Sequence, residues 1–217
     1  TAYGQLTGTN GLMLKTPSGS STITLTLANT ANAANDYSGN TTISANTTLA
    51  LGAANQIANG VGKGNLSNNG TFSMGGYSET INGLSGNGTI DGVSGTPTLT
   101  VGDNDATSTF SGIIKNTAGT LALTKNGNGT LTLSGANTYI GATTISAGTL
   151  QIGAGGTTGN LSTSSSISNN GTLTFNRTNT VTQGTDFASV ISGTGSVIQA
   201  GTGTLTLSGN NSYTGST

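Results

Sequence analysis

The sequence predicts an all-β protein folded as a right-handed parallel β-helix, or β-solenoid, of roughly ten coils. Three observations predict this fold: threonine alternates with apolar residues in short runs, Asn-Gly pairs separate the runs, and long segments of sequence recur along the chain. Alternation with period two places one side of a strand against a core and the other in water. A stack of similar coils accommodates such recurrence, because each coil contacts only its neighbours. The usual right-handed crossover between parallel strands sets the expected hand.

The composition allows a thin core but not a thick one. Only 5% of the 217 residues are charged, against about 25% in an average soluble domain, and the net charge is −1. Hydrophobic residues make up 31% of the chain, aromatic residues only 4%, and 37 residues are glycine. Low net charge argues against intrinsic disorder. The few scattered cations argue against a nucleic-acid partner and against an anionic lipid surface.

The expected strands follow one another along the chain in a regular way. Alternating runs are found at residues 22–27, 130–133 and 204–207, and the first and middle thirds each add a Thr-Thr-Ile-Ser-Ala segment, at residues 41–45 and 143–147. β-Branched threonine and isoleucine favour strands, and the frequent glycine argues against helices. Asn-Gly pairs between the runs predict tight corners, since both residues tolerate a positive φ. These pairs also suit two-residue hairpins, so taken alone they would permit an antiparallel meander.

The long repeats decide for the solenoid. Residues 127–139 and 201–213 are identical at ten of thirteen positions, at an offset of 74, and residues 37–45 match residues 139–147 at an offset of 102. The two offsets differ by 28, about the length of one further coil. We therefore predict a single β-solenoid over residues 1–217. Its repeat copies span approximately 21–91, 120–197 and 201–217 (incomplete), with an extra coil at approximately 92–119.

The most regular stretch, residues 123–150, resembles the passenger-associated transport repeat of bacterial autotransporters, also called the autotransporter-associated β-strand repeat. It reads Leu-Thr-Lys-Asn-Gly-Asn-Gly-Thr-Leu-Thr-Leu-Ser-Gly-Ala-Asn-Thr-Tyr through Ser-Ala-Gly-Thr-Leu. A partial copy occupies residues 201–217, and a degenerate copy occupies about 21–52. The resemblance implies a right-handed β-helical passenger that is exported and then displayed or released outside the cell. It also implies a role in passenger secretion and folding and carries no catalytic residues.

Few residues suit catalysis or metal binding. The chain has no His and no Cys, which excludes His-based triads and both His and thiolate metal sites. We expect no catalytic residue and no cofactor. Asp91, Asp103 and Asp105 form the only acidic cluster in the sequence, and we interpret them as a solvated loop. Asp103 and Asp105 are weak calcium candidates, but the glycine and glutamate that an EF-hand loop needs are missing after Asp103.

Three tyrosines occupy equivalent repeat positions: Tyr37, Tyr139 and Tyr213. Repeat positions mostly serve the scaffold, so we interpret these residues as stacked or capping aromatics at a corner. The alternative is an aromatic ladder that binds glycans, because an aromatic face can stack on a sugar. Exposure of the rings would distinguish the two.

Together these features predict a non-enzymatic structural or adhesive β-helix, extracellular or on the bacterial cell surface. Neither terminal coil looks capped, so we expect end-to-end self-association and consider a head-to-tail fibre. A glycan or host-surface ligand is a further expected partner, whereas nucleic acid and membrane insertion by this segment are not expected. A polysaccharide-binding or polysaccharide-active β-helix protein is the alternative, and flat threonine ladders leave an ice or mineral binder open.

Overall fold

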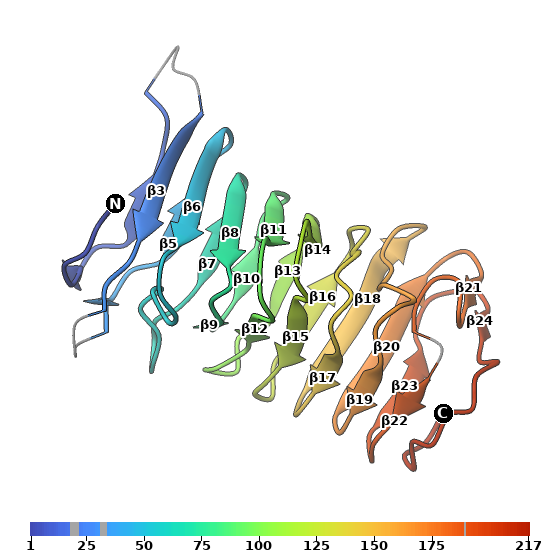
Figure 1. The fold of residues 1–217 in the computed structure, drawn as a ribbon. Helices are drawn as coiled ribbons and strands as arrows, with labels where there is room; N and C mark the ends of the chain where they lie inside the picture. Colours follow the sequence, from blue (N-terminus) through green and yellow to red (C-terminus); the bar gives the residue numbers. More distant parts are fainter. Residues whose placement is uncertain (18–21, 31–33, 189) are drawn as a thin grey trace.

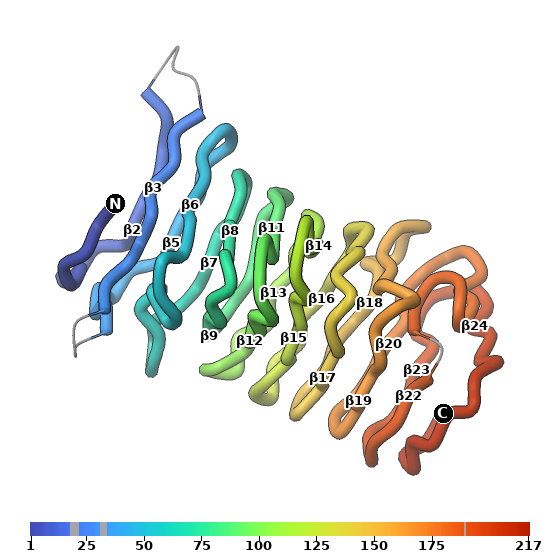
Figure 2. The backbone as a smooth tube through the Cα atoms, viewed as in Figure 1, coloured from blue at the N-terminus to red at the C-terminus, as the bar shows by residue number. Residues whose placement is uncertain are grey.

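The computed structural model describes residues 1–17, 22–30, 34–188 and 190–217. Its strands lie beside one another from the N-terminal to the C-terminal end, and the backbone winds around one long axis (Figures 1 and 2). The strands pair in parallel throughout the sheets, from β2 with β5 to β20 with β23. The described residues contain no α-helix. The chain is therefore a parallel β-solenoid, as the sequence predicts.

Each coil in the middle of the stack has three sides, and strands on the same side stack into a face. The first face joins two sheets through a bridge between Gly86 and Phe110. Its strands are β2 (Leu12–Leu14), β5 (Thr41–Ile43), β7 (Leu66–Asn68), β10 (Leu84–Ser85), β13 (Ser108–Phe110), β16 (Thr130–Leu133), β18 (Thr149–Gly156), β20 (Thr172–Arg177) and β23 (Ser196–Gln199).

The second and third faces are one sheet each. The second contains β3 (Ile23–Leu27), β6 (Thr47–Leu51), β8 (Thr71–Gly75), β11 (Thr89–Gly92) and β14 (Ile113–Asn116). The third contains β9 (Glu79–Ile81), β12 (Thr98–Val101), β15 (Ala122–Lys125), β17 (Thr143–Ile145), β19 (Ile167–Asn169) and β22 (Ile191–Ser192). Two short pairs lie nearer the ends: β1 (Thr7–Gly8) with β4 (Asp36–Tyr37), and β21 (Val181–Thr182) with β24 (Leu205–Thr206).

The nine stacked strands of the first face mark eight full turns, close to the ten expected. Coil length varies widely. Leu66 pairs with Leu84, 18 residues later, whereas Leu12 pairs with Thr41, 29 residues later. The corners absorb this variation, since an insertion in one corner leaves the pairing of its neighbours intact. The segment predicted as an extra coil makes one turn, because Gly92 pairs with Asn116.

Apolar side chains stack into columns inside the solenoid. Leu49, Phe72, Ile90 and Ile114 follow one another on the second face, and all four are fully buried. The alternate positions face outward, and on the third face they carry a hydroxyl on every rung. This ladder consists of Thr80, Thr100, Thr124, Thr144, Ser168 and Ser192.

Glycine at the Asn-Gly corners serves two different needs. Gly127 has φ +66°, as the corner argument predicts. Gly88 does not need a positive φ, but a Cβ there would collide with the carbonyl oxygen of Gly70 in the coil below. Close approach of backbones, rather than a left-handed conformation, therefore requires glycine at Gly88.

The repeat copies do not occupy the same faces. Lys125 in β15 lies on the third face, whereas its repeat equivalent Gln199 in β23 lies on the first. Likewise, Thr41–Ile43 forms β5 on the first face, and the matching Thr143–Ile145 forms β17 on the third. The middle copy is thus turned by one face relative to the copies on either side. Part of the first copy, at residue 21 and residues 31–33, lies outside the described residues.

Candidate binding surface

The three repeat tyrosines make the same hydrogen bond. Each hydroxyl lies within 2.5–2.7 Å of the hydroxyl of the threonine four residues later: Thr41 for Tyr37, Thr143 for Tyr139 and Thr217 for Tyr213. Tyr37 and Tyr139 are buried, and burial raises the pKa of both phenols. Their rings therefore offer no face to a sugar at the surface.

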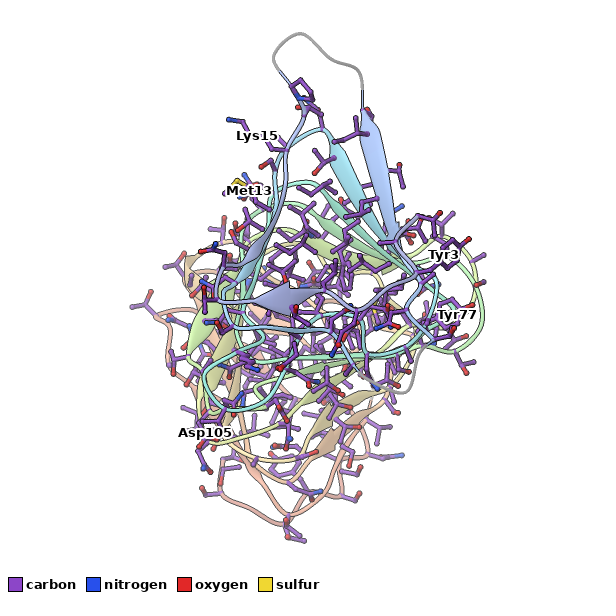
Figure 3. All side chains as sticks on the ribbon, turned by 90° about the vertical axis from the view of Figure 1, so that its left-hand side faces the viewer. Tyr3, Met13, Lys15, Tyr77 and Asp105 are labelled. Carbon is purple, nitrogen blue, oxygen red and sulfur yellow. The ribbon has the colours of Figure 1, made fainter. Side chains whose placement is uncertain are left out.

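The tyrosines that expose their rings lie outside the repeat positions. Tyr3 is 72% exposed and Tyr77 is 42% exposed. Both lie toward the same edge of the solenoid when it is viewed nearly along its axis, away from the corner that carries Asp105 (Figure 3). An exposed aromatic surface on this protein thus belongs to these two residues.

An asparagine two residues before each repeat tyrosine links neighbouring coils, a role that the sequence analysis missed. The side-chain carbonyls of Asn35, Asn137 and Asn211 each accept a backbone N–H at 2.9 Å, from Leu6, Ile114 and Ile191 respectively. In each case the side-chain NH₂ donates to another coil or corner. The constant Asn-x-Tyr spacing was the available signal.

The acidic residues do not converge on one site. Asp91 lies on β11 and pairs with Lys115 at 3.0 Å, and Thr117 donates two hydrogen bonds to it. Although burial opposes ionisation, these partners lower the pKa of Asp91. Asp105 lies in the corner beyond β12, where its Oδ1 accepts the Asn128 N–H at 2.6 Å. Among the residues described, no three acidic side chains gather where they could hold a metal ion.

Two ionisable residues inside the solenoid were not anticipated. Lys125 is fully buried between Val101 and Ile145, and its Nζ donates to the carbonyls of Asn126 at 2.6 Å and Gly127 at 2.8 Å. Desolvation lowers its pKa, opposed by the charge of Asp105. Glu79 is 1% exposed, and burial raises its pKa to about 8 although it accepts backbone N–H groups from Gln56 and Ile57.

The largest hollow is an open groove of about 540 Å³ over four successive coils. It forms where β18 leaves its sheet, since the pairing of β18 with β20 shifts register between Ile152 and Gly156. The chain beyond β18 builds one wall, and Arg177 holds that wall by donating from Nη1 to the Gly159 carbonyl at 2.9 Å and to Asp186 Oδ1 at 3.3 Å. The neighbouring strands are β14, β16, β18 and β20 (Figure 1).

Several polar side chains that line this groove have no partner within the described structure. The hydroxyls of Ser134, Thr157 and Thr158 and the side-chain amide of Asn160 make no hydrogen bond to any described residue. Ile113, which is 41% exposed, and Ala136 supply apolar surface between them. The arrangement can therefore exchange several hydrogen bonds with a ligand and pack against an apolar part of it. Nothing in the sequence pattern marked these residues.

Comparison with known proteins agrees with this architecture. Residues 18–45, 123–152 and 197–217 match the passenger-associated-transport-repeat family. The chain is 38% identical over 221 residues to the "Adhesin BmaC autotransporter" of Brucella suis biovar 1 (strain 1330), an alignment that covers 84% of this chain. The chain spans only 6% of the length of that relative. No solved structure matches significantly, and in the described part of the chain no helix is long and apolar enough to cross a membrane.

Proposed function

This chain is a stretch of an autotransporter passenger that carries passenger-associated transport repeats, and on that premise we propose that it is a non-catalytic adhesive segment. Its location is extracellular or on the bacterial cell surface. The observation that carries the proposal is the 38% identity to an autotransporter adhesin along most of this chain. A rigid rod with an almost uncharged surface of hydroxyls and amides suits adhesion at a distance from the cell body.

The acidic residues favour adhesion over polysaccharide cleavage. Glycoside hydrolysis uses a pair of carboxyl groups that flank one bond. Asp91 lies on the second face and is held by Lys115 and Thr117, whereas Asp103 and Asp105 follow β12 on the third face. A screen of glycan cleavage with the triple variant Asp91→Asn, Asp103→Asn, Asp105→Asn tests the alternative. Cleavage by the native chain that this variant loses would replace our proposal with an enzyme.

Adhesion itself is measured with beads coated with the purified chain and applied to epithelial cells and to extracellular matrix. We expect the coated beads to adhere more than beads coated with the same chain after heat unfolding. Equal adherence of the two bead types would contradict an adhesive role of the folded segment.

A second proposal concerns self-association. Leu131, Leu133 and Tyr139 are fully buried in the middle repeat, but their equivalents Leu205, Leu207 and Tyr213 are only half-buried. A further coil would cover these side chains, and we propose that the first coil of a second copy does so, end to end. Such contacts that do not close produce a filament.

Sedimentation and electron microscopy of the purified chain test this assembly. We expect concentration-dependent rods longer than one molecule, which Leu207→Asp should shorten because it places a charge in the contact. The matched control is Thr206→Asp, which changes an exposed neighbour on the same strand. Uniform monomers at high protein concentration would rule the assembly out.

A further inference from the structure

We propose that the groove beside β18 binds an uncharged glycan, with one or two sugar rings seated over Ile113, Ala136 and Asn160. This inference rests on the proposed adhesive function, for which it supplies a binding site and a class of ligand. It places the site on the irregular part of the solenoid rather than on the repeated tyrosines.

The size and floor of the groove suit a sugar. Its volume of about 540 Å³ lies within the range of about 300–1,000 Å³ that is usual for ligand sites. Ile113 keeps 41% of its surface exposed in an otherwise polar setting, and Ala136 is exposed in the next coil. The C–H face of a pyranose ring can pack on this apolar floor, which removes it from water.

The polar groups around the floor match sugar hydroxyls. Ser134, Thr157 and Thr158 each offer a hydroxyl that both donates and accepts, and the Asn160 amide donates from one atom and accepts at the other. These groups have no partner in the described structure, so a ligand gains their hydrogen bonds without breaking others. A hydroxyl-rich ligand, whose own groups also donate and accept, can satisfy all four.

The charges favour a neutral ligand. The two charged residues of the groove, Arg177 and Asp186, pair with each other, so the groove has no net charge. The side chain of Arg177 is only 7% exposed, and its Nε and Nη1 already bond to Asn179, Gly159 and Asp186. Arg177 is therefore a positioning residue that keeps the wall in place, which reduces the entropy that binding must overcome.

The test uses the whole 217-residue chain, labelled with ¹⁵N, and a fixed panel of neutral hexasaccharides: cellohexaose, maltohexaose, mannohexaose and chitohexaose. We expect at least one to shift the amide signals of residues 134–136 and 157–160 in a saturable way. Hexagalacturonate, an acidic probe, should bind more weakly than the best neutral probe. Absence of saturable shifts with all four neutral probes, shifts confined to another surface, or tighter binding of hexagalacturonate would overturn the inference.

Two variants locate the site. Ala136→Trp should fill the groove and abolish binding, whereas Ala142→Trp changes an exposed alanine of the same coil outside the groove and should bind normally. Asn160→Ala should weaken binding about threefold to tenfold, the effect of one lost hydrogen bond. If Ala136→Trp does not fold, Asn160→Ala decides alone. Unchanged affinity in a folded groove variant would place the ligand elsewhere.

The bead assay separates this inference from the adhesive function. Beads that adhere while no neutral hexasaccharide reaches the groove would refute the groove site and leave adhesion standing. Saturable sugar binding without adherence of the beads would refute the adhesive role and leave the groove site standing.

Discussion

The hydrogen bond between the repeat tyrosine and its threonine should stabilise the solenoid only where a further coil covers it. Tyr139 and Thr143 are both fully buried, and their hydroxyl oxygens are 2.7 Å apart. In Tyr139→Phe the Thr143 hydroxyl loses its partner and remains buried. A buried polar group left without a partner costs about 1–3 kcal/mol, so we expect a loss of this size in the free energy of unfolding.

The C-terminal repeat supplies the matched control. Tyr213 makes the same contact with Thr217, but Tyr213 is half-buried and Thr217 is exposed, so water can replace the lost bond. Tyr213→Phe should therefore change the free energy of unfolding by less than about 0.5 kcal/mol. Because all other features of the two sites match, the difference between the two variants measures the effect of burial.

Urea unfolding followed by circular dichroism measures both variants, and equal m values would show that the unfolding transition is comparable. For a chain of this size we expect Tm to fall by about 2–4 °C for each kcal/mol lost. In a double-mutant cycle, Thr143→Val in the Tyr139→Phe background should recover part of the loss, since it removes the stranded hydroxyl. Equal destabilisation by Tyr139→Phe and Tyr213→Phe, or strict additivity in the cycle, would refute the reasoning.

Three further predictions concern the ionisable residues. The folded pKa of Glu79, about 8, lies above its ordinary value of 4.5. Since the unfolded chain ionises first, the free energy of unfolding should fall as pH rises from 4.5 to 8, and Glu79→Gln should flatten this profile in urea titrations at several pH values; a profile unchanged by the substitution would contradict it. Lys125→Met should cost about 1–3 kcal/mol in urea unfolding because it leaves the Asn126 and Gly127 carbonyls without their donor, whereas Lys125→Gln should cost less, since Gln199 donates to corner carbonyls at the equivalent position; equal losses would show that the donor is not what matters. Asp103 and Asp105 remain a calcium prediction: we expect calorimetric titration to give no saturable heat, because Asp105 already accepts two bonds from Asn128, and a calcium-dependent rise in Tm that Asp105→Asn removes would show a site.

The architecture could be predicted from the sequence because the pattern of a solenoid is local. Alternation at Thr130–Leu133 and at Ile23–Leu27 decides which side chains enter the core, whatever coil they belong to. Recurrence of the same motif along the chain then favours stacking over a closed globular core. For the same reason the repeated Tyr-Ser-Gly and Tyr-Ile-Gly segments were identified as scaffold before their contacts were known.

The groove could not be predicted, because its residues are brought together from four coils without a common spacing. Ile113, Ser134, Asn160 and Asp186 lie at unrelated distances along the chain, and the register shift after Ile152 brings them to one hollow. Lys125 is a similar case: a charged residue in a polar corner motif normally lies in water, and only the stacking of Val101 below and Ile145 above shows that it is buried.

The amino-acid sequence by itself determined the parallel β-solenoid, the period of its strands and the tyrosine-centred repeat, since all three depend on contacts between residues that are close in sequence or separated by one coil. Only the tertiary structure decided which face each copy occupies. Coils of 18 to 29 residues accumulate different amounts of rotation about the axis, so the same motif reaches the third face as β15 and the first face as β23. The sum of many corner lengths is a property of the whole stack, and no single motif encodes it.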